Sequence, residues 1–124
     1  MKLTPNFSLS EFACRCGCGG EKKPEILANL RETALMLEEV RAGIGNKPIR
    51  VTSGYRCPTH NAADGGKKGS FHLTGKAADI KVDGMTPEQV RACARKSVKV
   101  KGIGRGRTFS HLDTRPGPRV EFDY

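Results

Sequence analysis

The sequence predicts a small α+β domain, with a central antiparallel sheet, helices packed on one side and a cleft on the other. Two helical patterns that each begin near a proline, and several short alternating strands, favour this class. The third observation is a long irregular segment, residues 54–69, because an ordered domain rarely carries such a loop without a functional use. With 124 residues and no low-complexity linker, we expect one domain over residues 1–124.

The composition, with 36% hydrophobic and 28% charged residues, fits a soluble globular protein. No apolar run approaches the roughly 20 residues that span a bilayer. No cleavable signal peptide is visible, so export would need another route. The net charge of +9 implies attraction to polyanions, such as nucleic acid or the anionic polymers of a bacterial envelope. Because no aromatic-rich basic strand or recognition helix is visible, nucleic acid is the weaker candidate.

The main helix is predicted to begin at Pro24, since proline suits the first turn. Its apolar stripe follows helical spacing, and Gly43 or Gly45 is expected to end it. The stripe consists of Ile26, Leu27, Leu30, Ala34, Leu37 and Arg41. We assign this face to core packing.

Two shorter helices are predicted from capping boxes. Ser8 and Glu11 open the first, which must end before the glycines at 17–20. Thr86 and Gln89 open the second. Its predicted buried face is Val90, Cys93, Ala94 and Ser97.

The predicted strands cover residues 49–53, 76–82, 102–106 and 108–114, with an edge strand at 119–124. Alternation with period two places Asp79 on the face opposite Ile80. In the same way, His111 and Asp113 share one face and Leu112 points to the core. The polar face therefore collects groups that could bind a ligand.

Two histidines and a carboxylate form a candidate metal site if the predicted strands pair. His72 and Asp79 lie seven residues apart across a glycine, and His111 lies on another predicted strand. Two imidazoles and one carboxylate can bind zinc and leave a position open for water. The alternative is that each histidine is an ordinary surface or core residue. The third histidine, His60, is expected to form loop or helix-cap hydrogen bonds.

The five cysteines are Cys14, Cys16, Cys18, Cys57 and Cys93. An odd number without a signal peptide favours reduced thiols. The Cys-x-Cys-x-Cys run resembles a metal knuckle, but structural zinc sites usually draw on two matched pairs. Buried or loop-bracing cysteines are therefore the favoured interpretation, and a second, structural metal is the alternative.

The motif Ser70-x-His72-x-x-Gly75-x-Ala77-x-Asp79, with His111-Leu112-Asp113 downstream, resembles the zinc D-alanyl-D-alanine carboxypeptidase and murein endopeptidase family. Relatives of that family include VanX-type dipeptidases, phage endolysins and the hedgehog signalling domain. The segment Ser53-Gly54-Tyr55-Arg56 also matches the family. The resemblance covers nearly the whole chain and implies a hedgehog-type fold with a zinc cleft.

The resemblance also implies roles for individual residues. His72, Asp79 and His111 take the places of the ligands of one Zn²⁺ ion. Arg56 matches the arginine that reaches the carboxylate or carbonyl of the substrate, and its alternative is a loop-bracing ion pair. Ser70 corresponds to a residue that lines the substrate.

Many members of the resembled family place the general base, a carboxylate or histidine, two or three residues before the last metal histidine. Here those positions hold Phe109 and Thr108, which cannot accept a proton. Asp113 is the candidate, about 7 Å along the strand from His111. The alternative role for Asp113 is to orient a metal ligand, and both interpretations stay open. Glu121 is a weaker candidate for the base.

The expected function is that of a zinc metallopeptidase that hydrolyses amide bonds in peptidoglycan peptides, as a D,D-carboxypeptidase or a murein endopeptidase. One alternative is a non-catalytic zinc-containing module that binds the cell wall, and a second is a basic nucleic-acid-binding protein. We expect a monomeric peptidase domain, a peptidoglycan peptide as partner, and neither nucleic acid nor a membrane span. The expected place of action is the cell wall or periplasm, reached after release as a phage-type lysin.

Overall fold

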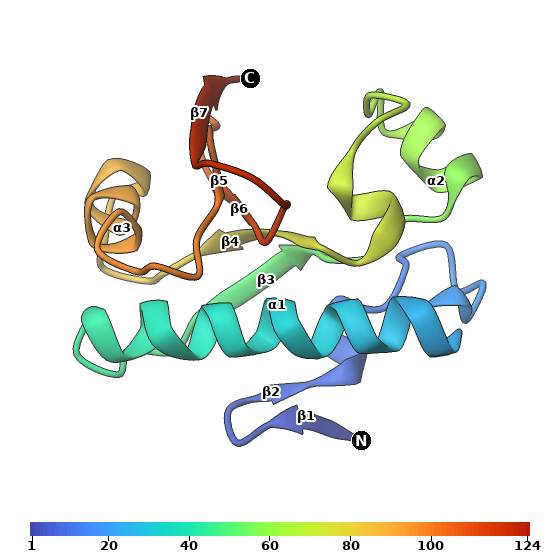
Figure 1. Ribbon diagram of the computed structural model, residues 1–124, viewed down its shortest axis with the longest axis horizontal. Helices are drawn as coiled ribbons and strands as arrows, with labels where there is room; N and C mark the ends of the chain where they lie inside the picture. Colours follow the sequence, from blue (N-terminus) through green and yellow to red (C-terminus); the bar gives the residue numbers. More distant parts are fainter.

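The computed structural model describes residues 1–124 as a five-stranded sheet, three α-helices and a separate two-stranded hairpin (Figure 1). The strands are β1 (Lys2–Thr4), β2 (Phe7–Ser8), β3 (Arg50–Ser53), β4 (Ala77–Lys81), β5 (Gly102–Arg105), β6 (Ser110–Asp113) and β7 (Val120–Asp123). The α-helices are α1 (Pro24–Gly43), α2 (Pro58–Ala63) and α3 (Pro87–Ala94). Three single-turn 3₁₀ helices are η1 (Leu9–Phe12), η2 (Gly20–Lys22) and η3 (Phe71–Thr74). The predicted α+β class is confirmed.

The sheet has the strand order β3-β4-β6-β5-β7. The first three pairings are antiparallel, as expected, whereas β7 pairs with β5 in parallel. The sheet is therefore mixed at its C-terminal edge. In the register, Asp79 on β4 lies opposite His111 on β6, and His111 lies opposite Gly104 on β5.

The two faces of the sheet differ in chemistry, as the alternation predicts. Ile80 and Leu112 point into the hydrophobic core, which also contains Leu30 and Leu37 of α1. The opposite face carries the buried polar side chains of Asp79, His111 and Asp113. Figure 1 shows α1 running along the sheet, with α3 and α2 at its two ends. Packing of one face against α1 thus leaves the opposite face to the polar side chains.

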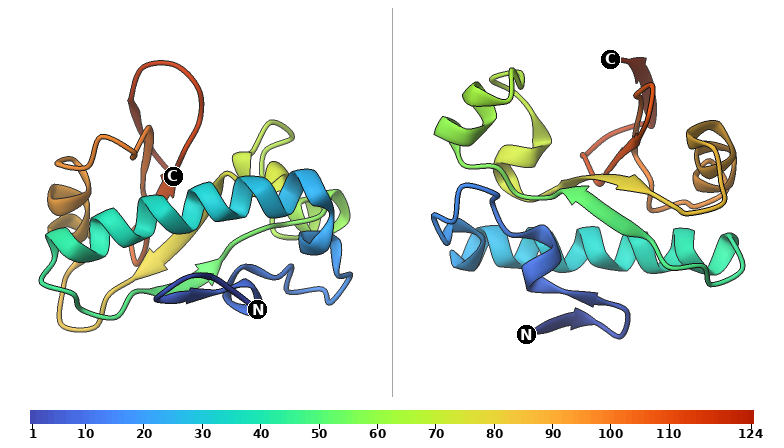
Figure 2. Two further views of the ribbon diagram at one scale, coloured as in Figure 1. Left: turned by 60° about the horizontal axis from the view of Figure 1, so that its bottom comes forward. Right: turned by 180° about the vertical axis from the view of Figure 1, so that it is seen from behind.

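The buried stripe of α1 includes four of the six predicted residues and is displaced by about one position toward the N-terminus. Leu27 and Arg41, both assigned to the core face, are only partly buried. The residues that are buried are Ile26, Leu30, Thr33, Ala34, Met36, Leu37 and Val40. The buried face of α1 is broader than predicted because β1 packs against the helix in addition to β4, η3 and α3. Figure 2 shows the N-terminal segment against α1 on the side away from α3.

The helix starts and ends follow the signals in the sequence. Pro24 and Pro87 stand in the first turns of α1 and α3, and the capping box of Thr86 and Gln89 is present. Glu11 accepts a 2.7 Å hydrogen bond from the Ser8 amide at the start of η1. Within the irregular segment, the only helix is α2. None of the helices is long and apolar enough to cross a membrane.

Candidate metal centre

Three side chains from three elements converge on the polar face of the sheet. They are His72 from η3, Asp79 from β4 and His111 from β6, and their ligand atoms all lie within 4.8 Å of one another. Oδ1 of Asp79 lies 3.1 Å from Nε2 of His72 and 3.2 Å from Nδ1 of His111. The structure therefore brings together the three residues that the spacing predicted.

A capped turn places His72 beside Asp79. The Ser70 hydroxyl accepts a 3.2 Å hydrogen bond from the His72 amide and so caps η3. Gly75 ends this turn with a left-handed φ of 79°, a conformation that glycine adopts without steric cost. The chain then enters β4 and brings Asp79 back under the imidazole. Ser70 also lines the neighbouring cleft.

Each imidazole is anchored through the nitrogen that points away from Asp79. Nδ1 of His72 lies 2.7 Å from the Gly54 carbonyl oxygen, which can only accept, so Nδ1 carries the proton. Nε2 of His111 donates over 2.7 Å to Oδ2 of Asp113. Partners of this kind fix the tautomer and orientation of metal-binding histidines. Nε2 of His72 and Nδ1 of His111 are therefore the nitrogens offered to a metal.

Glycines on β5 leave the space that this arrangement needs. A Cβ atom on Gly102 would lie 2.2 Å from Oδ2 of Asp113, and one on Gly104 would lie 2.8 Å from Cβ of His111. Real Cβ atoms do not approach other atoms so closely, so larger residues would displace both side chains. The Gly-x-Gly pattern of residues 102–104 thus has a steric reason.

The charges at the centre are strongly coupled. Burial alone would raise the pKa of Asp79, but the contacts with His111 and His72, in the form in which these imidazoles are protonated toward it, hold that pKa well below its usual value. Burial would also raise the pKa of Asp113, but hydrogen bonds from Arg115 and His111 lower it to about 2. For His111, burial opposes the charged form, yet the hydrogen bonds to Asp113 and Asp79 raise its pKa. Both carboxylates are therefore ionised near neutral pH.

Arg56 lies beside the centre with its guanidinium fixed by neighbours. Its Nη2 donates over 3.0 Å to Oδ2 of Asp79, and its Nε donates over 2.9 Å to the hydroxyl of Ser53. Nη1 reaches Oδ1 of Asn61 at 3.3 Å. Three of its five N–H donors are used in these bonds, which leaves two for a ligand. The arginine that the sequence singled out thus joins the metal group and also lines a cleft.

A cleft of about 690 Å³ opens beside His111. Its walls come from the segment of residues 65–71 and from the strand β7. In Figure 1 both rise above the level of β4, β7 near the centre and the segment to its right. Its lining residues are Arg56, Gly65, Gly66, Lys67, Gly69, Ser70, Phe71, His111, Arg115, Val120, Phe122, Asp123 and Tyr124. Three cations and three aromatic rings against a single carboxylate suit a ligand that carries negative charge and apolar groups. The irregular segment does form one wall of a site, as expected.

Two residues of this cleft escaped sequence reasoning, Tyr124 and Arg115. The Tyr124 hydroxyl lies 3.0 Å from Nδ1 of His111. Arg115 donates to both oxygens of Asp113, over 2.9 and 2.7 Å, and its guanidinium lies 4.7 Å from the centre of the Phe71 ring. No motif marks either residue. The only available signal was that Arg115 shares a strand end with Asp113.

The remaining polar residues considered from sequence lie away from the centre. His60 contacts Asp64 at 3.3 Å, in agreement with a loop interaction. Glu121, the weaker candidate for the base, is bonded to Arg95 and Arg105 and does not line the cleft.

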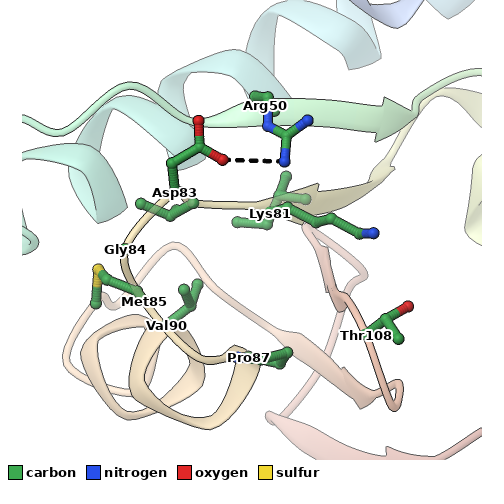
Figure 3. Close-up of a pocket in the computed structure, with 10 residues that line it drawn as sticks. Arg50, Lys81, Asp83, Gly84, Met85, Pro87, Val90 and Thr108 are labelled. Atoms are coloured by element: carbon green, nitrogen blue, oxygen red, sulfur yellow. Dashed lines mark ion pairs between the residues drawn. The ribbon is translucent and has the colours of Figure 1, made fainter.

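A second hollow, of about 260 Å³, lies between the end of β4 and the start of α3 (Figure 3). Its single carboxylate, on Asp83, forms a 3.0 Å ion pair with Arg50 and is largely exposed. It contains no histidine or cysteine. This hollow therefore offers no set of metal ligands.

The donor atoms fit a tetrahedral zinc ion. Ligands about 2.0–2.1 Å from such an ion lie roughly 3.3 Å apart, close to the 3.1 and 3.2 Å separations at Asp79. Three protein ligands of this type, with a position left open, characterise catalytic rather than structural zinc sites. The geometry thus points to a class, that of the zinc-dependent hydrolases.

Comparison with known proteins narrows this class to one family. The sequence matches the family Peptidase M15 over residues 5–113, and the chain belongs to that family. It is 34% identical over 85 residues to the probable peptidoglycan L,D-endopeptidase MepK of Haemophilus influenzae, across 63% of this chain and 45% of that protein. It is 36% identical over 78 residues to the zinc D-Ala-D-Ala carboxypeptidase of Streptomyces albus G, across 60% of this chain and 31% of that protein. The matched regions thus span less than half the length of these curated relatives.

Proposed function

We propose that this chain is a zinc-dependent peptidase that hydrolyses amide bonds in peptidoglycan peptides, with one Zn²⁺ held by His72, Asp79 and His111. The observation that carries the proposal is the orientation of the two imidazoles. Each has one nitrogen fixed by an acceptor behind it and the other turned to the same oxygen of Asp79. The names of the two relatives support the substrate and the metal, since one is a peptidoglycan endopeptidase and the other a zinc carboxypeptidase.

Zinc bound here supplies a Lewis acid for the scissile carbonyl and lowers the pKa of a coordinated water to about 7. The chain supplies orientation. Arg56, held by Asp79, Ser53 and Asn61, presents its two remaining donors as a fixed fork to a carboxylate or carbonyl oxygen of the substrate. Ser70 lines the same side of the cleft and contacts the substrate peptide.

Tyr124 joins this list as a hydrogen-bond donor. Burial, together with the negative charge of Asp79, raises the pKa of its phenol above the usual value. The hydroxyl therefore keeps its proton at neutral pH and lies 3.0 Å from a proposed ligand atom of His111. From this position it donates to the oxygen on which negative charge develops during amide hydrolysis.

For Asp113 we propose the orienting role rather than that of the general base. Its Oδ2 accepts from His111 and from Arg115, and its Oδ1 accepts from the Arg115 side chain and amide. Its side chain is fully buried and lies on the side of His111 that faces away from Asp79. Asp123 is the one carboxylate side chain that lines the cleft. Its Oδ1 accepts a 2.7 Å hydrogen bond from Arg105, whereas its Oδ2 accepts none from the protein, so this second oxygen is the candidate for proton transfer.

The charge of the cleft suits the proposed substrate and place of action. Arg56, Lys67 and Arg115 face a single acidic residue, and stem peptides of peptidoglycan carry free carboxylates. We propose that the chain acts on the cell wall or in the periplasm. The geometry supports carboxypeptidase and endopeptidase activity equally, and the products distinguish them.

The test is a digest of purified peptidoglycan in which released peptides and amino acids are identified by mass spectrometry. The wild-type chain with zinc is expected to release new amino termini. Release of single D-alanine identifies a carboxypeptidase, and cleavage within cross-links or stems identifies an endopeptidase. His72→Ala is expected to abolish release, whereas the matched variant His60→Ala keeps it, because the His60 side chain pairs with Asp64 and is not part of the centre.

Two outcomes would contradict the peptidase. If wild-type chain with zinc bound at His72 sediments with peptidoglycan but releases nothing, the chain is a binding module of the same fold. If His72→Ala releases products at the wild-type rate, the proposed centre is not the catalytic one.

A further inference from the structure

Four of the five cysteines meet at one place, away from the histidine centre. Cys14, Cys16 and Cys18 come from the loop after η1, and Cys57 is the N-cap of α2. The four sulfur atoms all lie within 4.8 Å of one another, although Cys57 is distant in sequence. The separations include 3.2 Å between Cys14 and Cys16 and 3.6 Å between Cys16 and Cys57. Cys93, on α3, is outside the group.

The four sulfurs are spaced for a metal ion rather than for one another. Sulfur atoms about 2.3 Å from a tetrahedral zinc ion lie roughly 3.8 Å apart, within the range seen here. A disulfide would need about 2.05 Å, and all five thiols are free. The sulfur of Cys16 also lies close to two other sulfurs, those of Cys14 and Cys57, whereas a disulfide joins only two.

Backbone amides point at three of the sulfurs. The amide of Cys57 donates to Sγ of Cys14, that of His60 to Sγ of Cys57, and that of Gly20 to Sγ of Cys18, each over 3.4 Å. Hydrogen bonds of this kind favour the thiolate, which is the form that binds metals.

Apolar packing does not explain the cluster, because burial, one half of the interpretation favoured from sequence, applies fully to only one of the four cysteines. Only Cys14 is buried; Cys16 and Cys18 are exposed and Cys57 is half-buried. The loop that carries them contains no regular helix or strand between η1 and η2. It turns through Gly17 and Gly19, which have left-handed φ angles of 78° and 75°.

We propose that Cys14, Cys16, Cys18 and Cys57 bind a second, structural Zn²⁺ ion through four thiolates. Four protein ligands close the coordination sphere, as in structural sites, and thiolates select soft or borderline metals such as zinc. The ion ties the N-terminal loop to the start of α2. Because Cys57 directly follows Arg56, it also fixes the backbone of the arginine that reaches Asp79. The site is independent of the peptidase proposal.

The first experiment uses the chain with its cysteines intact and the other centre removed. His72→Ala is produced in medium in which cobalt replaces zinc, and its absorption spectrum is recorded. The expected result is one Co²⁺ per chain with intense sulfur-to-cobalt charge-transfer absorption in the near ultraviolet, which histidine and aspartate ligands cannot produce. A folded chain without that absorption overturns the proposal, and the result does not depend on any peptidase activity.

The second experiment compares cysteine variants by zinc analysis in the same His72→Ala background. Cys16→Ser is expected to lose the remaining zinc ion, whereas the matched control Cys93→Ser keeps it. Zinc retained in folded Cys16→Ser at the level of Cys93→Ser would contradict the assignment. If Cys16→Ser does not fold, alkylation decides on the cysteine-intact chain: Cys93 should react first, and the other four only after chelation. Five equally reactive thiols, or a disulfide between any two of the four, would overturn the site.

Discussion

Oδ2 of Asp113 accepts a 2.7 Å hydrogen bond from Nε2 of His111. The other ring nitrogen of His111 lies 3.2 Å from Asp79, so the two carboxylates hold the imidazole from its two sides. Arg115 in turn holds both oxygens of Asp113. This chain of contacts aligns a proposed metal ligand and leaves Asp113 no free oxygen with which to take a proton from water.

Asp113→Asn is expected to lower the affinity of the histidine centre for zinc by roughly 10–100-fold, the usual cost of losing a partner behind a metal ligand. The substitution removes the negative charge that makes His111 a stronger zinc ligand, but it leaves the ligand itself in place. Most of the activity should therefore return at saturating zinc. The measurement is a zinc titration against a competing chelator, followed by kcat at saturating metal.

The matched variant is Asp123→Asn, which alters the only carboxylate that lines the cleft. It should leave zinc affinity unchanged and lower kcat. The opposite result would return the role of base to Asp113. In that case Asp113→Asn would lose kcat with unchanged zinc affinity, and Asp123→Asn would keep full kcat.

The fold was predictable where local chemistry decides it. Pro24, Pro87 and the capping boxes mark real helix starts, and alternation placed Asp79 and His111 on the correct face. The hairpin of β1 and β2 was not predicted, because strands of two and three residues show no periodicity. The parallel pairing of β7 also escaped, since its partner is chosen by tertiary packing.

The site was predictable only in part, for the same reason. The three groups that converge could be named because the spacing of His72 and Asp79 is local and a family motif links them to His111. Tyr124 reaches His111 only because β7 pairs beside β5, which the sequence does not show. The cysteine cluster could not be predicted because its fourth member, Cys57, comes from a distant segment and is not part of a second Cys pair in the sequence.

Arg56→Lys is expected to reduce kcat/KM by roughly 10–100-fold. Lysine keeps the charge but cannot hold Ser53, Asn61 and Asp79 at once, and hydrogen bonds to charged groups contribute about 1.5–3 kcal/mol each. The measurement is steady-state hydrolysis of a soluble stem peptide. The control Arg50→Lys changes an exposed arginine paired with Asp83 (Figure 3) and should keep the wild-type rate. Equal rates for the two variants would show that Arg56 only braces its loop.

Tyr124→Phe tests the hydroxyl beside His111. The ring should stay in place, because its centre lies 5.1 Å from that of Phe109 and 5.8 Å from that of Phe122. Zinc content should not change, since the hydroxyl is not a proposed ligand. The loss of one hydrogen bond of about 0.5–1.5 kcal/mol should lower kcat/KM by up to roughly tenfold. A kcat/KM equal to that of the wild type would remove Tyr124 from the mechanism.

Gly102→Ala probes the centre without replacing any of its polar residues. The added methyl would lie 2.2–2.4 Å from the carboxyl group of Asp113, so that side chain must move. Overpacking of a filled site costs about 1–3 kcal/mol of stability, and the displaced carboxylate can no longer align His111. We therefore expect a lower melting temperature together with weaker zinc binding at the histidine centre. The control is Gly43→Ala in α1, where a methyl meets nothing within 4 Å and alanine favours the helix, so stability should hold or rise. If Gly102→Ala is destabilised yet binds zinc as tightly as the wild type, the position of Asp113 does not govern the metal ligand, and the orienting role proposed for it is wrong.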